Sequence, residues 1–287
     1  MNSRERLKKA AEELRKKGVP DPEYDSGILL AEVTGIPYLE LRMGVEDIPD
    51  GSQEEAFQKL LARRGAREPL QYILGNVTFL GIPFRVSPGV LIPRPETELL
   101  AEWAISKMQD AAEPEILDLC CGTGCLGLSL GKRLPGARVT LTDLSPDAVR
   151  LAKENAEKQG IACDIRQGDL FAPCEGRRFD CILSNPPYIP SGICEDLQPE
   201  VLREPRLALD GGPDGLEFYR RIAGDVPRHL KPGGLLFLEV GDGEARAVRE
   251  LLAEQGAEET EIRKDYSGIE RMVCGRYRRT GEACLKN

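Results

Sequence analysis

From about residue 112 onward, short apolar segments alternate with helical patterns, and this alternation constrains the fold more than any other feature of the chain. The apolar segments lie at about 115–119, 138–143, 162–167, 179–184 and 234–240. Their length is that of buried strands, and helices fit between most of them. Strands and helices in alternation form a mostly parallel sheet with helices on both faces. We therefore predict an α/β fold for this part of the chain.

The first seventy or so residues have a different pattern, typical of a small helical bundle. Ser3 can cap a helix with apolar residues at helical spacing. Asp21 followed by Pro22 predicts a second helix start, and Gly35 a plausible end. Residues 52–55, Ser-Gln-Glu-Glu, form a capping box before a third apolar pattern. These helices are too few to form a large core.

Between the two regions, residues 72–86 alternate apolar and polar side chains around Gly75 and Gly81, which suggests a β-hairpin. We therefore expect three parts: a helical, substrate-docking domain over 1–71, a hairpin linker over 72–92 and a larger domain over 93–287. A later helix should begin at Ser145-Pro146-Asp147.

Charge and cysteine content exclude several classes of function. The net charge is −9, with no long run of Lys and Arg, whereas a nucleic-acid-binding protein normally has a basic face. The nine cysteines are scattered and odd in number, none forms a Cys-x-x-Cys pair, and His229 is the only histidine. We interpret the cysteines as small buried hydrophobic residues in a reducing cytosol, and we expect no zinc site.

Neither a membrane span nor a signal peptide is expected. No apolar run approaches the roughly 18 residues that a span needs. The N-terminus leads directly into an amphipathic helical pattern and has no apolar leader segment. We expect a cytoplasmic protein.

A glycine-rich segment follows the first strand of the α/β region. Gly122, Gly124 and Gly127 spell G-x-G-x-x-G, and Asp143 follows about 20 residues later. Such a loop lets a ligand approach the backbone, and Asp143 suits ribose hydroxyl groups. Asp118, just before the loop, could hold an ammonium group of the ligand. On this match alone, a dinucleotide-dependent oxidoreductase is a serious alternative, and a turn that serves only packing is another.

The segment Asn185-Pro186-Pro187-Tyr188 directly follows the strand at 179–184. Ligands of open α/β sheets bind at the carboxyl ends of the strands, so this tetrapeptide should face the same crevice as the glycine loop. A rigid turn with an Asx contact is the alternative for a tetrapeptide of this kind taken alone. Its position beside a cofactor loop favours a catalytic role.

The residue types of this tetrapeptide suit the methylation of a planar nitrogen. An amide or aromatic amino nitrogen is a poor nucleophile with two N–H donors in one plane. The Asn185 side-chain carbonyl and the Pro186 backbone carbonyl can accept both, while Tyr188 offers a flat face. Positive charge that builds on the nitrogen strengthens both contacts, which stabilises the transition state.

With these motifs in view, the chain resembles the class I S-adenosylmethionine methyltransferases that modify planar nitrogens. Further segments narrow the resemblance to the peptide chain release factor glutamine methyltransferases. The segments are residues 68–75, 92–98, 204–206, 209–215 and 264–271. Together they span nearly the whole chain.

The resemblance implies a Rossmann-like, seven-stranded methyltransferase sheet whose last strand is antiparallel. It implies S-adenosyl-L-methionine as methyl donor, S-adenosyl-L-homocysteine as product and no metal. It implies that the substrate is the glutamine of the Gly-Gly-Gln motif in class I release factors, with no stable binding of nucleic acid or membrane.

The resemblance also assigns residues to the site. The expected cofactor-binding residues are Asp118, Cys120, Cys121, Gly122, Thr123, Gly124, Asp143, Leu170 and Asn185. Asn185, Pro186, Pro187 and Tyr188 should hold the glutamine, with Asn185, Pro186 and Tyr188 as catalytic residues. Two positions depart from the family: Cys120 and Cys121 stand where Gly-Thr is common, and Leu170 stands where some members have an aromatic residue. We expect the backbone at Cys120 to avoid a conformation that only glycine adopts.

Two other functions remain open from sequence. An adenine-N6 methyltransferase shares the chemistry of Asn185 to Tyr188 but must flip a base out of DNA, and the acidic balance of the chain disfavours it. A catalytically idle partner-binding module would leave the intact set of site residues unexplained.

Overall fold

The computed structural model describes residues 2–44 and 51–278. Contacts divide the chain into two units. The first, which we call the helical unit, contains the chain up to Asn76 together with Gln198–Arg203. The second, the sheet unit, contains Val77–Leu197 and the chain from Glu204 onward.

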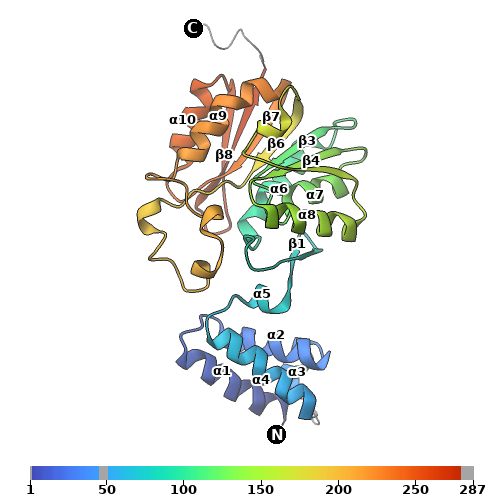
Figure 1. The fold of residues 1–287 in the computed structure, drawn as a ribbon, viewed down its shortest axis with the longest axis vertical. Coiled ribbons are helices and arrows are strands. Elements are labelled where there is room, and N and C mark those ends of the chain that lie inside the picture. Colours follow the sequence, from blue (N-terminus) through green and yellow to red (C-terminus); the bar gives the residue numbers. More distant parts are fainter. Residues whose placement is uncertain (1, 45–50, 279–287) are drawn as a thin grey trace. The chain divides into compact units, whose positions relative to one another are not determined.

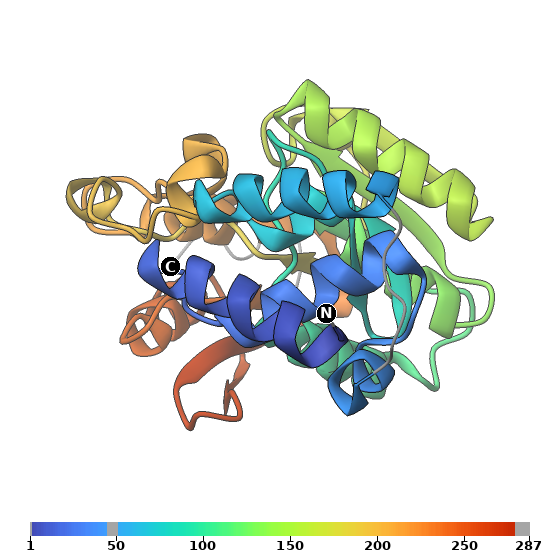
Figure 2. The same cartoon turned by 90° about the horizontal axis from the view of Figure 1, so that it is seen from below.

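Within residues 2–44 and 51–76, the helical unit is built from five α-helices (Figures 1 and 2). They are α1 (Ser3–Lys16), α2 (Pro22–Thr34), α3 (Tyr38–Met43), α4 (Gly51–Gly65) and α5 (Leu70–Leu74). Helices α1, α2 and α4 pack against one another around a small core that includes Leu14, Leu30 and Phe57. The prediction of a small helical bundle is confirmed.

The helix starts differ in detail from those predicted. Asn2, not Ser3, caps α1, because the Asn2 side chain accepts a hydrogen bond from the backbone N–H of Glu5. Ser3 is already helical, and its hydroxyl donates to the carbonyl of Leu41 instead. Helix α2 begins at Pro22 and ends at Gly35, as predicted, with Gly35 in the left-handed conformation. Helix α4 already includes the predicted capping residue Ser52, and the residues just before this helix lie outside the described chain.

The predicted hairpin is confirmed, but it begins later than expected. Strands β1 (Asn76–Phe79) and β2 (Ile82–Arg85) form a two-stranded sheet around a turn at Gly81, whose φ is +75°. Residues that precede it form helix α5, which ends at Gly75 with φ +72°. A left-handed glycine ends a helix as readily as it makes a turn, so the pattern did not distinguish the two.

The sheet unit contains a seven-stranded sheet in the order β5-β4-β3-β6-β7-β9-β8. The strands are β3 (Glu115–Leu119), β4 (Arg138–Asp143), β5 (Cys163–Gln167), β6 (Phe179–Ser184), β7 (Leu230–Glu239), β8 (Glu259–Lys264) and β9 (Glu270–Tyr277). Strands β3 to β7 run parallel, and the last strand, β9, is antiparallel to its neighbours β7 and β8. The predicted α/β fold and the antiparallel last strand are confirmed.

Helices cover both faces of this sheet (Figure 1). One apolar cluster joins a face of the sheet to α6 (Pro95–Met108), α7 (Cys125–Arg133) and α8 (Pro146–Gln159). The other joins the opposite face to α9 (Glu217–His229) and α10 (Ala245–Glu254). Successive residues of one strand belong to different clusters: Leu183 packs in the first and Ile182 in the second. This division follows from the two-residue period of a strand buried on both sides.

The ends of the parallel strands position the candidate site. Leu119 of β3 pairs in register with Thr142 of β4 and with Ser184 of β6. The loops after β3, β4 and β6 therefore leave the sheet at one edge. As predicted, Ser145 caps α8 by accepting a hydrogen bond from Ala148 N–H.

The cysteines of the described chain are all free thiols, and most are buried, as interpreted from sequence. Within the same residues, no helix is long and apolar enough to cross a membrane.

Candidate functional site

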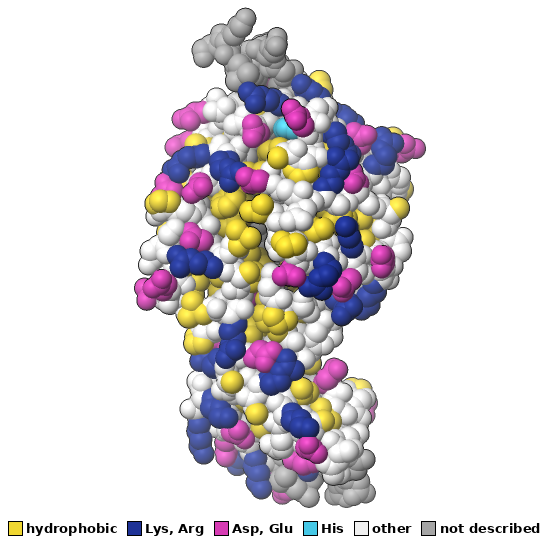
Figure 3. Space-filling view, viewed as in Figure 1, with side chains coloured by type: hydrophobic (Ala, Val, Ile, Leu, Met, Phe, Trp, Pro, Cys, Tyr) yellow, Lys and Arg dark blue, Asp and Glu magenta, His cyan; other side chains and the backbone are white. Residues whose placement is uncertain are grey.

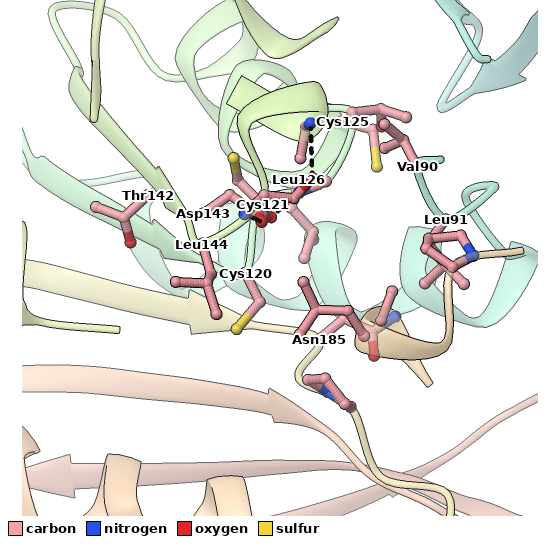
Figure 4. Close-up of a pocket in the computed structure, with 18 of the residues that line it drawn as sticks. Val90, Leu91, Cys120, Cys121, Cys125, Leu126, Thr142, Asp143, Leu144 and Asn185 are labelled. Atoms are coloured by element: carbon pink, nitrogen blue, oxygen red, sulfur yellow. Dashed lines mark hydrogen bonds between the residues drawn. The ribbon is translucent and has the colours of Figure 1, made fainter. Parts of the chain in front are cut away.

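A pocket opens at the edge where the parallel strands end. It holds about 970 Å³ of empty space, part of it open to solvent, and its walls are mostly apolar. Thr142, Asp143 and Leu144 lie to one side of the view in Figure 4, and Val90 and Leu91 to the other. Its size is within the range of small-molecule and cofactor sites.

Most of the predicted cofactor-binding residues line this one pocket. They are Cys120, Cys121, Gly122, Thr123, Asp143, Leu170 and Asn185. The predicted residues Gly124 and Asp118 do not border it. Residues from four separate loops thus meet at the sheet edge, as expected from the parallel strands.

The glycines of the loop have two different roles. Gly122 and Gly124 have φ values of +54° and +79°, a region that favours glycine. Gly127 lies in helix α7, where a Cβ would come within 2.4 Å of the Leu141 side chain and 3.0 Å of Cβ of Asp118. Its missing side chain therefore lets α7 pack closely on the sheet.

The backbone at Cys120 contradicts our expectation. Its φ is +55°, so a cysteine occupies the left-handed conformation that favours glycine. Leu170, the other position that departs from the family, has a φ of +44° and also lines the pocket. Both side chains are accommodated in this conformation at a cost of order 1 kcal/mol each, because left-handed backbone is strained for residues with a Cβ.

Asp143 connects the loops after β3 and β4. Its Oδ2 accepts a hydrogen bond from Gly122 N–H at 2.9 Å, and its Oδ1 accepts one from Ser145 N–H at 2.8 Å. Burial raises the pKa of this carboxyl group, although the backbone hydrogen bonds oppose the shift. Asp143 also lines the pocket, and a carboxylate can accept about four hydrogen bonds, so it has capacity for a further donor there.

Asp118 is fully buried under the glycine loop. Its Oδ2 accepts a hydrogen bond from Gly127 N–H at 2.8 Å, while its Oδ1 has no partner among the described residues. Burial raises the pKa of Asp118 to about 7. The side chain thus holds the start of α7 in place, and direct contact with a ligand's ammonium group stays a prediction.

Asn185 is held by a chain of hydrogen bonds. Its Nδ2 donates to Thr97 Oγ1 at 3.3 Å, and Thr97 Oγ1 donates to Glu239 Oε2 at 2.6 Å. Within the described chain, neither Asn185 Oδ1 nor the Pro186 carbonyl oxygen accepts a hydrogen bond from another residue. Both oxygens are therefore available to accept hydrogen bonds from a planar nitrogen.

The other members of the tetrapeptide are arranged around Asn185. Pro187 lines the pocket, and Pro186 is buried beside it. Tyr188 is half-buried, and its hydroxyl lies 3.5 Å from Glu239 Oε1. Burial raises the pKa of Tyr188 well above the ordinary value of a phenol, so its hydroxyl stays protonated.

Sequence reasoning missed several residues of the site. Thr97 lines the pocket and Glu239 lies behind it, yet neither was singled out. The loop after β6 also returns to the pocket through Pro205 and Leu207. Glu204 fixes this return by accepting hydrogen bonds from Ile92 N–H and from the Arg94 guanidinium. The segments 92–98 and 204–206 carried the only signal, since both belong to the family resemblance.

The thiols of the loop have no nucleophilic character. Burial raises the pKa of Cys120 and of Cys121 well above the ordinary value and that of Cys125 to about 12. Because the thiolate is the reactive form of cysteine, these groups act as apolar walls.

Comparisons with known proteins show which family the chain belongs to. Residues 5–75 match the family model described as the PrmC N-terminal domain, and residues 96–212 match the methyltransferase small domain. A release factor glutamine methyltransferase of Geobacter sulfurreducens is 43% identical, over 92% of each chain. One from Moorella thermoacetica is 39% identical, over 97% of this chain and 99% of that one.

A solved structure shows the same fold at lower identity. The 16S rRNA N2 G1207 methyltransferase of T. Thermophilus is 22% identical and has a TM-score of 0.54, over 71% of this chain and 50% of that chain. The likeness of the sheet unit to this enzyme concerns the fold alone. The relatives at about 40% identity, matched over nearly their full length, show that the chain belongs to the release factor glutamine methyltransferase family.

Proposed function

We propose that this protein transfers a methyl group from S-adenosyl-L-methionine to the side-chain amide nitrogen of glutamine in the Gly-Gly-Gln motif of class I release factors. The observation that carries the proposal is the arrangement of Asn185. Its amide nitrogen is used by Thr97, which leaves its carbonyl oxygen and that of Pro186 to accept the two N–H groups of a planar amide.

The pocket fits S-adenosyl-L-methionine. Asp143 lines it with carboxylate lone pairs that suit ribose hydroxyls, and Leu144 and Leu170 supply apolar surface for a base. The loop from Cys120 to Thr123 borders the same space, so a ligand can approach the backbone there. When bound, the cofactor supplies an electrophilic methyl group on its sulfonium.

The residues of the chain lower the barrier by orientation and by charge. Asn185 and the Pro186 carbonyl would fix the glutamine nitrogen, and two consecutive prolines keep these acceptors in place. Positioning of this kind can supply several kcal/mol, up to about 7–11 in ideal cases. The two acceptors also bind more tightly as the nitrogen gains positive charge, which selectively stabilises the transition state.

Replacement of Asn185 by alanine tests this assignment. We expect Asn185→Ala to bind S-adenosyl-L-methionine with at most a modest loss, while kcat falls by about 100- to 1,000-fold, as when one positioned contact is lost. Calorimetry measures the binding, and mass mapping of a release factor incubated with labelled cofactor measures the transfer. A variant that retains its full turnover would overturn the assignment of Asn185.

The choice of substrate distinguishes this function from adenine methylation in DNA. On the face drawn in Figure 3, Lys and Arg side chains are interspersed with Asp and Glu, and hydrophobic side chains gather around a hollow. Base flipping needs phosphate contacts to hold the duplex. We expect labelling of a release factor, abolished when its Gly-Gly-Gln glutamine is replaced, and no labelling of duplex DNA at physiological salt. Methylated adenine with an unlabelled release factor would overturn the proposal.

We assign the docking of the release factor to the helical unit. This unit exposes two large apolar side chains on α3, Leu39 at 69% and Met43 at 75% exposure. Residues 39 and 43 lie about one helical turn apart, so these two side chains share one face of α3 and offer a small apolar surface to a protein partner. The double variant Leu39→Ser and Met43→Ser should raise the KM for the release factor and leave cofactor affinity unchanged. The control, Leu144→Ser in the pocket of the sheet unit, should weaken cofactor binding and leave the KM for the release factor unchanged. An unchanged KM in the double variant would refute docking at α3.

A further inference from the structure

The site contains a buried glutamate that no step of the proposed transfer uses. Glu239 ends strand β7 and is 2% exposed. Its Oε2 accepts a hydrogen bond from Thr97 at 2.6 Å, and its Oε1 lies 3.5 Å from the hydroxyl of Tyr188. One carboxyl group therefore contacts Thr97 of α6, which binds Asn185, and Tyr188, which belongs to the tetrapeptide itself. A buried charge is unfavourable unless it is hydrogen-bonded, so the groups that contact this carboxylate determine its role.

We propose that Glu239 and Thr97 are positioning residues that fix the orientation of the Asn185 amide, so that its carbonyl oxygen and not its nitrogen faces the substrate. This inference rests on the proposed function and assigns two further residues to it. The side-chain contacts that carry it join three elements that are far apart in the sequence: β7, α6 and the loop after β6.

The direction of each hydrogen bond follows from what each group can donate. A carboxylate only accepts, so the single hydroxyl proton of Thr97 is committed to Glu239. Thr97 Oγ1 can then only accept from its other neighbour, and the sole donor of the Asn185 side chain is Nδ2. A flipped Asn185 would place its carbonyl oxygen against an oxygen with no proton to offer. The carboxylate thus selects one of the two amide orientations.

This selection is important because the two orientations of an asparagine amide have nearly the same shape. In the flipped orientation, the amino group of Asn185 would face an N–H donor of the glutamine amide, and that hydrogen bond would be lost. The hydroxyl of Tyr188 lies 3.5 Å from the other oxygen of the same carboxylate. If Thr97 lost its hydroxyl, the Asn185 side chain would still fit in its place. The orientation in which its carbonyl oxygen faces the substrate would no longer be preferred.

Three substitutions separate positioning from a purely structural role. Thr97→Val keeps the shape of the side chain and removes its hydroxyl. We expect kcat to fall by about 10- to 100-fold, the range for losing one hydrogen bond to a charged partner. The dissociation constant of S-adenosyl-L-methionine and the KM for the release factor should stay within about twofold, since a preserved orientation is not needed for binding. Thr97→Ser retains the hydroxyl and should restore most of kcat.

A matched control lies on the same helix. Ser106 of α6 donates its hydroxyl only to the Trp103 carbonyl one turn earlier. Ser106→Ala therefore removes one hydroxyl hydrogen bond from α6 without touching the chain from Glu239 to Asn185. We expect its kcat to equal that of the unmodified protein.

Glu239→Gln supplies a second, independent measurement through pH. Burial raises the pKa of Glu239 to about 7, and the hydrogen bond from Thr97 opposes this rise. The charged groups that face it are Arg94 and Glu96 before and within α6, Arg271 on β9, and the phenol of Tyr188. Below this pKa a protonated Glu239 can itself donate to Thr97, which frees the Thr97 proton for a flipped Asn185. We therefore expect kcat of the unmodified protein to fall as the pH is lowered through about 7.

The glutamine variant should lose this acidic limb of the kcat profile. Its side-chain amide can either accept from or donate to Thr97 at every pH, as protonated Glu239 can, so kcat should stay near the level of the acidic limb and should not depend on this titration. Asp118 and Glu244 also have pKa values raised to about 7. The limb is therefore assigned to Glu239 only by its disappearance in Glu239→Gln.

The experiment measures kcat, both binding parameters and the pH profile for the unmodified protein, Thr97→Val, Thr97→Ser, Ser106→Ala and Glu239→Gln, with release factor and labelled cofactor. The proposal is supported by low kcat in Thr97→Val, rescue by serine and loss of the acidic limb in Glu239→Gln. It is overturned if folded Thr97→Val turns over within about twofold of the unmodified protein, or if Glu239→Gln keeps the limb. Absence of release factor labelling by the unmodified protein would instead refute the proposed function itself.

Discussion

A cluster of buried charges joins the loop segment Gln198–Arg203 to the helices of the helical unit, and this cluster yields a quantitative prediction. Arg64 is 4% exposed and donates to Asp25 at 2.7 Å and to Glu200 at 2.8 Å. Arg67 donates to both oxygens of Glu200, at 2.6 and 2.5 Å. Glu200 therefore receives three charge-assisted hydrogen bonds from two guanidinium groups. The perturbation that removes all three is Glu200→Ala.

The magnitude follows from the ionisation of Glu200. Burial raises its pKa, but the hydrogen bonds from Arg67 and Arg64 outweigh burial and lower the pKa from 4.5 to about 2. A shift of this size corresponds to about 3 kcal/mol, and a small discount for the exposed part of the group gives about 2–3 kcal/mol. Removal of one partner of a buried ion pair has a similar cost of about 3–5 kcal/mol. Because the native pKa is lowered, the stabilisation is present above pH 4.5 and is lost as the pH falls toward 2.

Two spectroscopic probes report on the two units separately. Trp103, the only tryptophan, lies in the sheet unit, so its fluorescence follows that unit, while circular dichroism also follows the helices α1 to α5. With a urea dependence of about 1 kcal/mol per molar for a unit this small, Glu200→Ala should lower the helical midpoint by roughly 2 M at pH 7. The Trp103 transition should shift less. The control Glu55→Ala breaks an exposed pair with Lys59 and should shift the midpoint by less than about 0.5 M. Equal midpoints for Glu200→Ala and Glu55→Ala would refute the reasoning.

Four further predictions concern the sheet unit. Asp143→Ala should weaken S-adenosyl-L-methionine binding by about 10- to 100-fold or more, since it removes the carboxylate that suits the ribose and that orders Gly122 and Ser145; calorimetry on the folded variant measures this. Cys120→Gly should keep its activity, because glycine prefers a φ of +55°, and turnover should survive in Cys120→Ser and Cys121→Ser; loss of turnover in the folded serine variants would make a thiol essential. Tyr188→Phe should retain more turnover than Tyr188→Ala, because the ring face and not the long contact to Glu239 is required; steady-state kinetics with equal loss in both would contradict this. Between pH 4.5 and 7 the stability of the ligand-free protein should fall as the pH rises, because Glu239 binds its proton more tightly in the folded state. Asp118 and Glu244 act in the same direction, so Glu239→Gln should reduce but not abolish this slope in thermal unfolding.

Buried apolar strands were the most predictable part of the fold. The predicted limits of β3, β4 and β6 agree with the structure because each of these strands is covered on both faces and therefore reads as an apolar run. Strand β8 (Glu259–Lys264) has the sequence Glu-Thr-Glu-Ile-Arg-Lys and lies at the edge of the sheet, where most side chains meet solvent. Its polar composition gave no strand signal. Strand β7 begins at Leu230, earlier than predicted, because Pro232 and the glycines after it masked its start.

Sequence predicted those residues of the candidate site that directly follow the parallel strands. Asp143 and Asn185 were found because parallel strands bring their carboxyl ends to one edge. Thr97 and Glu239 were missed because their bond joins residues 142 positions apart, and no local pattern encodes such a contact. The last three residues of helix α5, 72–74, were predicted as part of the hairpin because glycine serves helix ends and turns equally well.

Two residues of the pocket have a left-handed backbone conformation although neither is a glycine. They show that the fold, and not the residue type, sets the backbone conformation at these positions. Cys120 and Leu170 have φ values of +55° and +44°, and both follow parallel strands of the same sheet. After each strand the chain turns sharply along the wall of the pocket. A positive φ makes this turn within one residue. The cost of a side chain in this conformation is repaid where that side chain covers apolar surface, as Leu170 does in the cluster with Phe171. The turn is therefore imposed by the sheet, and the residue type adjusts only its cost. The residue types at these positions alter the walls of the pocket, while the sheet keeps the position of Asn185 and the orientation of the loop that holds it.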